Sequence, residues 1–481
     1  MAYRNEGLDH FPIKFLFSLK RVGEGMEKTT TGIEQDTTVR KSYLIFVSVI
    51  AAVGGFIFGY DLSIIAGASL FLKAEFGLTP FWLGFAVSSA VIGCIIGPLA
   101  GGGLTDRWGR KKALYLCAIL FGISAIGTAL PRTMTEFYIF RILGGMGVGL
   151  ASIVSPMYIA EVAPSRLRGR LVLVNQLAIV VGSLSSIIVS YFLSLSGAWR
   201  WMFASELVPI LVLLIGLTLV PESPRWLVQM NRRGEALGVL NKIGGSQYAD
   251  LELDRIARSL KKKVGSFSDL FRPGLRTAMF IAFTLAVLQQ FSGTSPLLFH
   301  TPLIFQRAGF DNISEAILQS IIVNVWNLTC TAFGLWAVDR FGRRPLLLTG
   351  TCAMAIGFAL MGTYFFFDMA GIYLLVTMFM VVGGFVISLA PLAWLIMSEI
   401  FPMHLRAKAM QLAALGLWVS AFIGALIVPP MLTYFKETFG SEAGTFWIFM
   451  LVCIFSVFFG WRMVPETKGR SLEEIGESWT K

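Results

Sequence analysis

Long apolar stretches, each about 20 residues, recur along most of this 481-residue chain. A helix needs about 20 such residues to cross about 30 Å of hydrocarbon. Only 14% of the residues are charged, far below the roughly 25% of soluble domains, which excludes a soluble enzyme. The sequence therefore predicts an all-α membrane protein with twelve transmembrane helices, near 43–69, 81–104, 112–130, 134–156, 171–193, 199–220, 276–306, 314–338, 345–366, 371–397, 408–434 and 443–464.

Three motifs occur twice, in the same order and at nearly constant spacing. The run 106–111 (DRWGRK) returns as 339–344 (DRFGRR), Glu161 with Arg168 returns as Glu399 with Arg406, and Pro221-Glu222-Ser223 returns as Pro465-Glu466-Thr467. Such repetition predicts two pseudo-symmetric halves of six helices each. We expect a tail over 1–42, a first half over 43–220, a central helical segment over 221–275, a second half over 276–464 and a tail over 465–481.

Basic residues are distributed unequally between the two sides of this topology. The tails and alternate connections carry 34 Lys and Arg, and the intervening connections carry five. By the positive-inside rule, both termini and the central segment are expected in the cytoplasm. The net charge of +11 is thus an orientation signal and not a sign of nucleic-acid binding. Polar helices are expected over 232–263, with lipid-headgroup contact by Lys261-Lys262-Lys263 as the alternative.

Three charged residues lie inside predicted spans, where charge is costly and is a functional candidate by default. Asp61, Arg141 and Glu206 are each expected roughly 10–12 Å below the outer surface. Protonation of Asp61 would release Arg141, so the pair predicts proton coupling in preference to a static ion pair. Glu206 is either a third member or a residue held at the outer interface by Arg200 and Trp201.

The repeated acids and arginines at the cytoplasmic ends of the spans predict an inner gate. Ion pairs across the two halves would hold it shut while the outside is open, and they would break when the inside opens. Basic loops that only orient the protein would not explain the repeated acids and glycines. The predicted gate residues are Asp106, Arg107, Arg110, Glu161, Arg168, Glu222, Arg225, Asp339, Arg340, Arg343, Glu399, Arg406 and Glu466.

Neutral polar side chains at membrane depth predict a hydroxyl-rich ligand, because amides both donate and accept hydrogen bonds. Gly293, Ser295 and Pro296 predict a broken helix whose free backbone groups line a cavity, and Pro391 predicts another. The alternative for each amide is helix packing. Candidate ligand contacts are Gln176, Gln289, Gln290, Asn327 and Trp394.

These motifs resemble the sugar porter family of the major facilitator superfamily. The resemblance covers nearly the whole chain after the first tail. The matching motifs are residues 59–61 (GYD), 103–111 (GLTDRWGRK), 141–149, 161–169, 221–227 (PESPRWL), 289–293 and 465–469. It implies a major facilitator fold that opens alternately to either side around a central hexose or pentose. It also implies sugar contacts for the five candidates above, and an Asp61–Arg141 partnership typical of proton symporters.

The sequence departs from the family pattern at four places. Ser295 stands where an Asn is usual, Phe299-His300 replaces an aromatic pair, Ala390-Pro391 replaces a Gly-Pro, and Leu417 replaces a frequent amide. A lost neutral hydrogen bond is worth on the order of 1 kcal/mol, so we expect altered specificity before loss of transport. Ser295 is retained as a candidate sugar contact. His300 is expected to substitute simply for a Tyr, with a pH-dependent contact to substrate or gate as the alternative.

The sequence thus predicts a proton-coupled symporter of a monosaccharide or polyol, in the lipid bilayer of a prokaryotic inner membrane. It is expected to be a monomer and to have no enzymatic activity, cofactor, metal or nucleic-acid partner. The alternatives are a facilitator without proton coupling and a non-transporting sugar sensor. Cys94, Cys117, Cys330, Cys352 and Cys453 all lie in apolar runs and are expected to be buried residues without disulfides.

Overall fold

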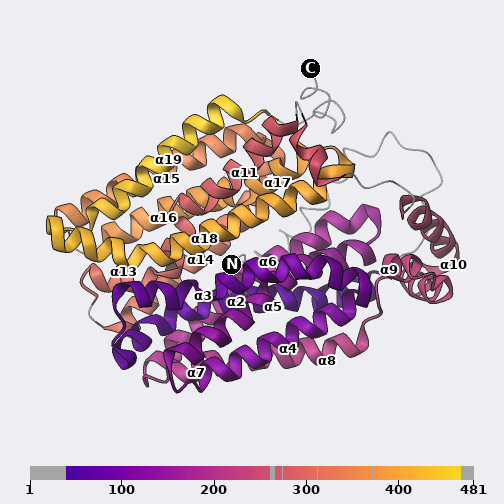
Figure 1. Cartoon of the computed structure of the whole chain (residues 1–481), viewed down its shortest axis with the longest axis horizontal. Helices are drawn as coiled ribbons and strands as arrows, with labels where there is room; N and C mark the ends of the chain where they lie inside the picture. Colours follow the sequence, from indigo (N-terminus) through magenta and orange to yellow (C-terminus); the bar gives the residue numbers. More distant parts are fainter. Residues whose placement is uncertain (1–39, 261–265, 273–274, 311, 370–371, 467–481) are drawn as a thin grey trace, which may run out of the picture.

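The computed structural model describes residues 40–260, 266–272, 275–310, 312–369 and 372–466. Within these ranges, twelve helical segments are long and apolar enough to span a membrane, which confirms the predicted fold class. The helices form two neighbouring bundles, indigo to magenta for the first half and pink to yellow for the second (Figure 1).

The first half contains seven helices because its sixth span is broken. Ser205, between α7 and α8, donates its hydroxyl to the Met202 carbonyl at 2.5 Å, and such a bond competes with the helical ladder. The break places Glu206 at the start of α8. The helices of this half are α2 (Lys41–Phe76), α3 (Pro80–Trp108), α4 (Arg110–Ala129), α5 (Met134–Val162), α6 (Ser165–Ser194), α7 (Trp199–Ala204) and α8 (Leu207–Leu219).

The second half has two broken spans. The break at Gly293 lies where the sequence predicted it, and the other lies at Ser388, three residues before Pro391, from which it was predicted. Gly293 adopts φ 90°, a conformation that favours glycine, and ends the first part of the seventh span. Ser388 interrupts the tenth span. The helices of this half are α11 (Leu275–Phe291), α12 (Thr294–Phe299), α13 (Thr301–Arg307), α14 (Ile313–Phe341), α15 (Arg343–Phe366), α16 (Ile372–Ile387), α17 (Leu389–Glu399), α18 (Met403–Phe439) and α19 (Ala443–Met463).

Helix pairs inside the first half approach each other through glycines. A Cβ atom on Gly59 of α2 would lie 1.8 Å from the Ile179 carbonyl oxygen of α6, and one on Gly145 of α5 would lie 1.7 Å from the Ala90 oxygen of α3. Small residues of this kind let backbones come close where lipid removes the hydrophobic drive for association. The close packing fixes α2 and α5, the two helices that carry Asp61 and Arg141.

The central segment folds into α9 (Pro224–Gln229), α10 (Arg233–Leu260) and the short helix η1 (Phe267–Phe271). α10 is kinked at Gly245, whose φ is 81°. α9 and α10 share a small core that includes Trp226, Leu240 and Ile256, and they project beyond the end of the bundle (Figure 1). These helices match the predicted polar helices, while Lys261-Lys262-Lys263 lie outside the described residues.

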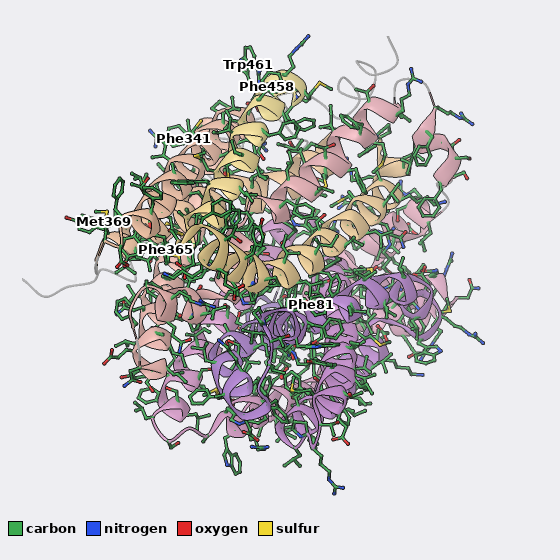
Figure 2. All side chains as sticks on the ribbon, turned by 60° about the vertical axis from the view of Figure 1, so that its left-hand side comes forward. Phe81, Phe341, Phe365, Met369, Phe458 and Trp461 are labelled. Carbon is green, nitrogen blue, oxygen red and sulfur yellow. The ribbon has the colours of Figure 1, made fainter. Side chains whose placement is uncertain are left out.

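Large apolar side chains cover the outside of the bundle. Figure 2 labels Phe81, Phe341, Phe458 and Trp461, whose exposed fractions range from 50% to 59%. An apolar exterior of this extent suits contact with lipid. Cys352 is exposed as well, so the expectation that all five cysteines are buried is wrong for this residue. Its place on a helix face turned away from the core explains the difference.

The two halves meet at the end of the bundle opposite α9 and α10. A Cβ on Gly84, near the start of α3, would lie 2.2 Å from the Leu426 oxygen of α18. The Ser194 hydroxyl of α6 bonds to that of Ser314 at the start of α14, at 2.8 Å. Deeper in the same interface, Ser183 donates to the Asn324 side-chain oxygen at 3.2 Å. The structure is therefore closed at this end.

Candidate functional site

A fully buried ion pair joins α2 to α5. Arg141 Nη1 lies 2.8 Å from Asp61 Oδ1 and also donates to the Asp61 backbone oxygen at 3.1 Å. The two side chains are 1% and 0% exposed. Asp61 Oδ2 and Arg141 Nη2 have no hydrogen-bond partner among the described residues. One carboxylate oxygen is thus held by the guanidinium, and the other is available to a proton.

Glu206 is the third charged member of this cluster. Its side chain is 1% exposed, and it lies close enough to Asp61 and Arg141 to interact with the charge of each. Arg200, which could have held Glu206 at the outer interface, pairs with Glu75 at 2.7 Å. Trp201 is 68% exposed and points away. The structure thus favours the reading in which Glu206 belongs with the buried pair.

Small and aromatic residues shape the surroundings of the pair. A Cβ on Gly144 would lie 3.4 Å from Asp61 Oδ1 and 2.3 Å from the Ser124 hydroxyl, so glycine at this position leaves room for the carboxylate. The Phe203 ring centre lies 6.0 Å from the Arg141 guanidinium carbon, within cation–π range. The glycine-rich run 144–149 on α5 therefore has a direct packing role beside the charges.

The glutamine pair lies at the break in the seventh span. The buried Gln289 donates its Nε2 to the carbonyl oxygens of Leu389, at 3.1 Å, and Ala390, at 2.8 Å. Both carbonyls belong to the first turn of α17, directly after the break in the tenth span. Gln290 is half-buried, and within the described residues its amide makes no hydrogen bond to this break. The two broken spans are therefore joined through the amide of Gln289 alone of the pair.

The other predicted sugar contacts come from three further helices. Gln176 on α6 is exposed, Asn327 on α14 is half-buried, and Trp394 on α17 is 36% exposed. The Asn327 Oδ1 accepts a weak hydrogen bond from Thr331 at 3.4 Å. Ser295 on α12 is half-buried. None of these polar groups is sealed in a core, as a ligand site requires.

Two aromatic residues at the interface between the halves were not among the predicted contacts. The rings of Phe58 on α2 and Trp418 on α18 lie 6.3 Å apart. Each had a signal in the sequence, because Phe58 precedes the run 59–61 and Trp418 follows Leu417. Their ring faces suit the apolar face of a sugar.

The departures from the family pattern have clear structural settings. Leu417 is buried, at 3% exposure, and adds apolar contact where an amide is frequent. His300 is fully buried between α12 and α13, and its Nε2 lies 2.8 Å from the Ala425 oxygen of α18. Its ring therefore joins the junction of α12 and α13 to α18.

A network of polar contacts ties the motifs of the first half together. Arg110 lies 2.8 Å from Glu161, and the Ser223 hydroxyl donates to Glu161 at 2.6 Å. Glu222 accepts hydrogen bonds from the amides of Arg110 and Lys111, at 3.0 and 3.2 Å. Burial raises the pKa of the Glu222 carboxyl, although these amide bonds oppose the rise. The carboxylate caps α4, whose Gly109 has φ 94°.

The second half repeats the network. Arg343 lies 3.1 Å from Glu399, and Glu466 accepts from the amides of Arg343 and Arg344 at 3.2 and 3.0 Å. Arg340 packs over the Trp336 ring at 5.3 Å. The side chain of Asp339 lies outside the described residues. The duplicated motifs thus make duplicated contacts.

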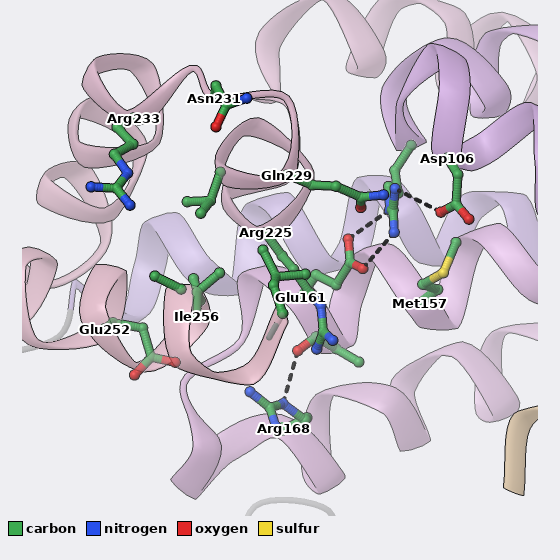
Figure 3. A pocket seen from close by; sticks show the side chains of 15 residues that line it. Asp106, Met157, Glu161, Arg168, Arg225, Gln229, Asn231, Arg233, Glu252 and Ile256 are labelled. Carbon is green, nitrogen blue, oxygen red and sulfur yellow. Dashed lines mark hydrogen bonds and ion pairs between the residues drawn. The ribbon is translucent and has the colours of Figure 1, made fainter. Parts of the chain in front are cut away.

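These contacts correct one part of the predicted gate. The carboxylate of Glu161 pairs with Arg110, and the Arg168 Nε donates to the Ala160 carbonyl at 2.8 Å (Figure 3). The pairs that Glu161 and Arg343 form stay within one half, because α4 and α5, or α15 and the end of α17, lie side by side. Asp106, Arg107 and Arg225 are exposed, and Arg406 is half-buried. A latch across the halves remains a prediction for the opposite conformation.

Comparisons with known proteins agree with this geometry. Residues 47–479 match the family model described as "Sugar (and other) transporter". The chain is 38% identical to the D-xylose-proton symporter of Escherichia coli K12, over 92% of this chain and 97% of that one. It is also 38% identical to the arabinose-proton symporter of Bacillus subtilis, over 95% and 100%.

A solved structure shows the same architecture. The inward open conformation of the xylose transporter XylE from E. coli superposes with a TM-score of 0.80 at 37% identity, covering 91% of this chain and all of that one. The family match, the full-length relatives and the shared fold lead to one assignment. The chain belongs to the sugar transporter family and is a multi-pass membrane protein with the major facilitator fold.

Proposed function

We propose that this protein carries a monosaccharide or related polyol across the membrane together with a proton, by alternating access. The observation that carries the proposal is the buried Asp61–Arg141 pair at 2.8 Å beside Glu206. Two buried carboxyl groups lie near one guanidinium, so a proton on one of them would relieve the excess negative charge. The relatives named above as proton symporters support the same role.

The proposed cycle links that proton to movement of the halves. Protonation of Asp61 removes the attraction that holds α2 to Arg141 on α5. α2 also contacts α12 and α13 of the second half, next to the break at Gly293. Release of α2 would therefore act on the helices that follow the break at Gly293, next to the glutamine pair, and so link the proton to the sugar.

The closed and open ends define the present state and orientation. We place both termini, α9 and α10 in the cytoplasm, because the basic residues gather there. The contacts of Gly84 and Ser194 then close the outer end, as expected for an inward-facing state. The predicted cross-half latch of Arg168, Arg225 and Arg406 would form when the inner end closes.

Uptake into liposomes tests the proposed function. Purified protein is reconstituted, an inward proton gradient is imposed, and labelled xylose, arabinose, galactose, glucose and inositol are offered. We expect uphill uptake of at least one of them, abolished by a protonophore. Downhill uptake indifferent to the gradient would favour a facilitator. If none of the polyhydroxylated solutes entered, the proposal would fail.

Gln290 is the amide that we assign to the sugar. We expect Gln290→Ala to raise the KM for uptake by about tenfold with little change in kcat, because a lost hydrogen bond and an unpaired sugar hydroxyl together weaken binding. Gln247→Ala, an exposed residue on α10, is the matched control and should leave KM unchanged. Equal KM values for the two variants would remove Gln290 from the sugar site.

A further inference from the structure

A pair of hydroxyl groups lies directly beside the charged cluster. The Tyr60 hydroxyl on α2 lies 2.6 Å from the Ser205 hydroxyl at the break in the sixth span. A serine hydroxyl has one proton, and Ser205 donates it to the Met202 carbonyl at 2.5 Å, so Tyr60 is the donor to Ser205. Tyr60 is 3% exposed, so its hydroxyl is held by this bond and not by solvent.

The two hydroxyl residues are the chain neighbours of the two carboxyl residues. Tyr60 precedes Asp61 on α2, and Ser205 precedes Glu206 at the start of α8. A bond of 2.6 Å between the first pair therefore limits how far apart the second pair can lie. In agreement with this, the Glu206 carboxyl lies close enough to Tyr60 and to Asp61 to interact electrostatically with both.

The backbone at this break is irregular. Pro209 has no amide hydrogen, so the Ser205 carbonyl accepts from the Val208 amide instead, at 3.2 Å. The Glu206 amide bonds at 3.2 Å to the Phe203 carbonyl, in a turn tighter than that of an α-helix. Glu206 Oε1 has no hydrogen-bond partner among the described residues. The direction of the Glu206 carboxyl therefore depends on how the break is held against α2.

The other groups that face the cluster come from α3, α4 and α5. Arg141 of α5 gives its Nη1 to Asp61. The buried Cys94 thiol of α3 lies within electrostatic range of Asp61 and Arg141. The buried Ser124 hydroxyl of α4 has no hydrogen-bond partner among the described residues. These three groups surround the ion pair, while the bond from Tyr60 to Ser205 joins α2 to the break.

We propose that Tyr60 and Ser205 are positioning residues of the proton site. Their bond holds the Glu206 carboxyl beside Asp61, and the nearby negative charge strengthens proton binding by the cluster. Both residues act through Glu206 and do not hold the proton themselves. The inference rests on the proposed function, because it adds two residues to the proton site of that cycle.

Infrared titration of the purified full-length protein tests the positioning role without transport. The carbonyl stretch of a protonated carboxyl is followed against pH, and Asp61→Asn and Glu206→Gln identify the band of the cluster, because each should remove or shift it. Tyr60→Phe keeps the ring, whose centre lies 6.0 Å from that of Phe56, and loses only the hydroxyl. We expect it to move the pH midpoint of the band toward acid by about one unit, a tenfold loss of proton affinity.

Matched variants separate this shift from general damage to helix packing. Ser205→Ala should shift the midpoint as Tyr60→Phe does, whereas Ser205→Thr keeps a hydroxyl and should restore it. The double variant should shift no further than either single one, because both remove the same bond. Tyr158→Phe removes another buried hydroxyl bond of 2.6 Å, to the Pro221 carbonyl, and should leave the midpoint unchanged. Retained sugar binding, followed by calorimetry, shows that each variant is folded.

Transport supplies a second signature. In liposomes, the outside pH at which uphill uptake falls to half should move toward acid by the same amount in Tyr60→Phe. In the Asp61→Asn background, which cannot take up the proton, Tyr60→Phe should leave counterflow unchanged. A defect of packing alone would lower counterflow in both backgrounds.

Failure of the positioning role is distinguishable from failure of the proposed function. If the parental protein shows no protonated carboxyl that responds to Asp61→Asn or Glu206→Gln, the cluster binds no proton and both ideas fail. If that band is present and Tyr60→Phe and Ser205→Ala keep the parental midpoint, only the positioning role is overturned. Equal shifts in Tyr60→Phe and Tyr158→Phe would overturn it as well, since the effect would then not depend on the bond at the break.

Discussion

Asp61→Asn is expected to abolish uphill sugar uptake while leaving exchange of sugar across the membrane intact. An inward driving force of 100 mV is worth about 2.3 kcal/mol per proton, which concentrates a sugar about fiftyfold. Asn keeps an oxygen that can accept from Arg141 but cannot take up the proton. The accumulation ratio in liposomes should therefore fall to about one, since no part of the proton gradient reaches the sugar.

Counterflow and a matched variant separate this effect from misfolding. Removing one partner of a buried ion pair can cost about 3–5 kcal/mol, so retained counterflow is needed to show that the variant is folded. Glu75→Gln makes the same carboxyl-to-amide change in a pair with Arg200 whose side chains are 40% and 43% exposed. It should accumulate sugar normally. Continued accumulation by Asp61→Asn would remove Asp61 from the coupling step.

The charged cluster could be predicted from the positions of its residues along their spans. Asp61, Arg141 and Glu206 were expected at one depth because membrane helices rise by a fixed 1.5 Å per residue. Charges are rare at that depth and face the interior of the bundle, so charges at the same depth are expected to lie in one site. The structure brings Asp61 and Arg141 to 2.8 Å and buries Glu206 beside them. The sequence did not decide whether Glu206 lies near Arg141 or near Arg200. The answer depends on the break at Ser205, which apolar periodicity does not reveal.

The cytoplasmic motifs show where sequence spacing stops being informative. Glu161 and Arg168 recur as Glu399 and Arg406, and we expected such repeated charges to pair across the two halves. In the fold, Arg110 at the start of α4 lies nearer to Glu161 and takes the carboxylate. Local spacing cannot predict this pair, because it depends on how α4 and α5 pack. Phe58 and Trp418 were missed for a similar reason, since aromatic residues are common in this sequence and only tertiary contact distinguishes these two.

Gly84→Trp is expected to stop all transport, including the exchange that Asp61→Asn retains. In this structure, Gly84 of α3 lies against the Leu426 carbonyl of α18, where even a Cβ would come within 2.2 Å. An indole cannot fit between two backbones, so the outer end cannot close. Overpacking worth about 3 kcal/mol reduces the closed population by about a hundredfold. Uptake and counterflow should both fall by that factor.

The variant should nevertheless fold and bind sugar, because the clash arises only in the state that is closed outside. Sugar binding to detergent-solubilised Gly84→Trp, followed by calorimetry, should therefore persist. Gly122→Trp on α4 is the control, since a Cβ there would meet nothing within 4 Å, and it should transport normally. Transport by Gly84→Trp at the parental rate would mean that α3 and α18 need not meet during the cycle. Together with Asp61→Asn, this variant would separate two events of the proposed cycle, protonation of the charged cluster and closure of the outer end at Gly84.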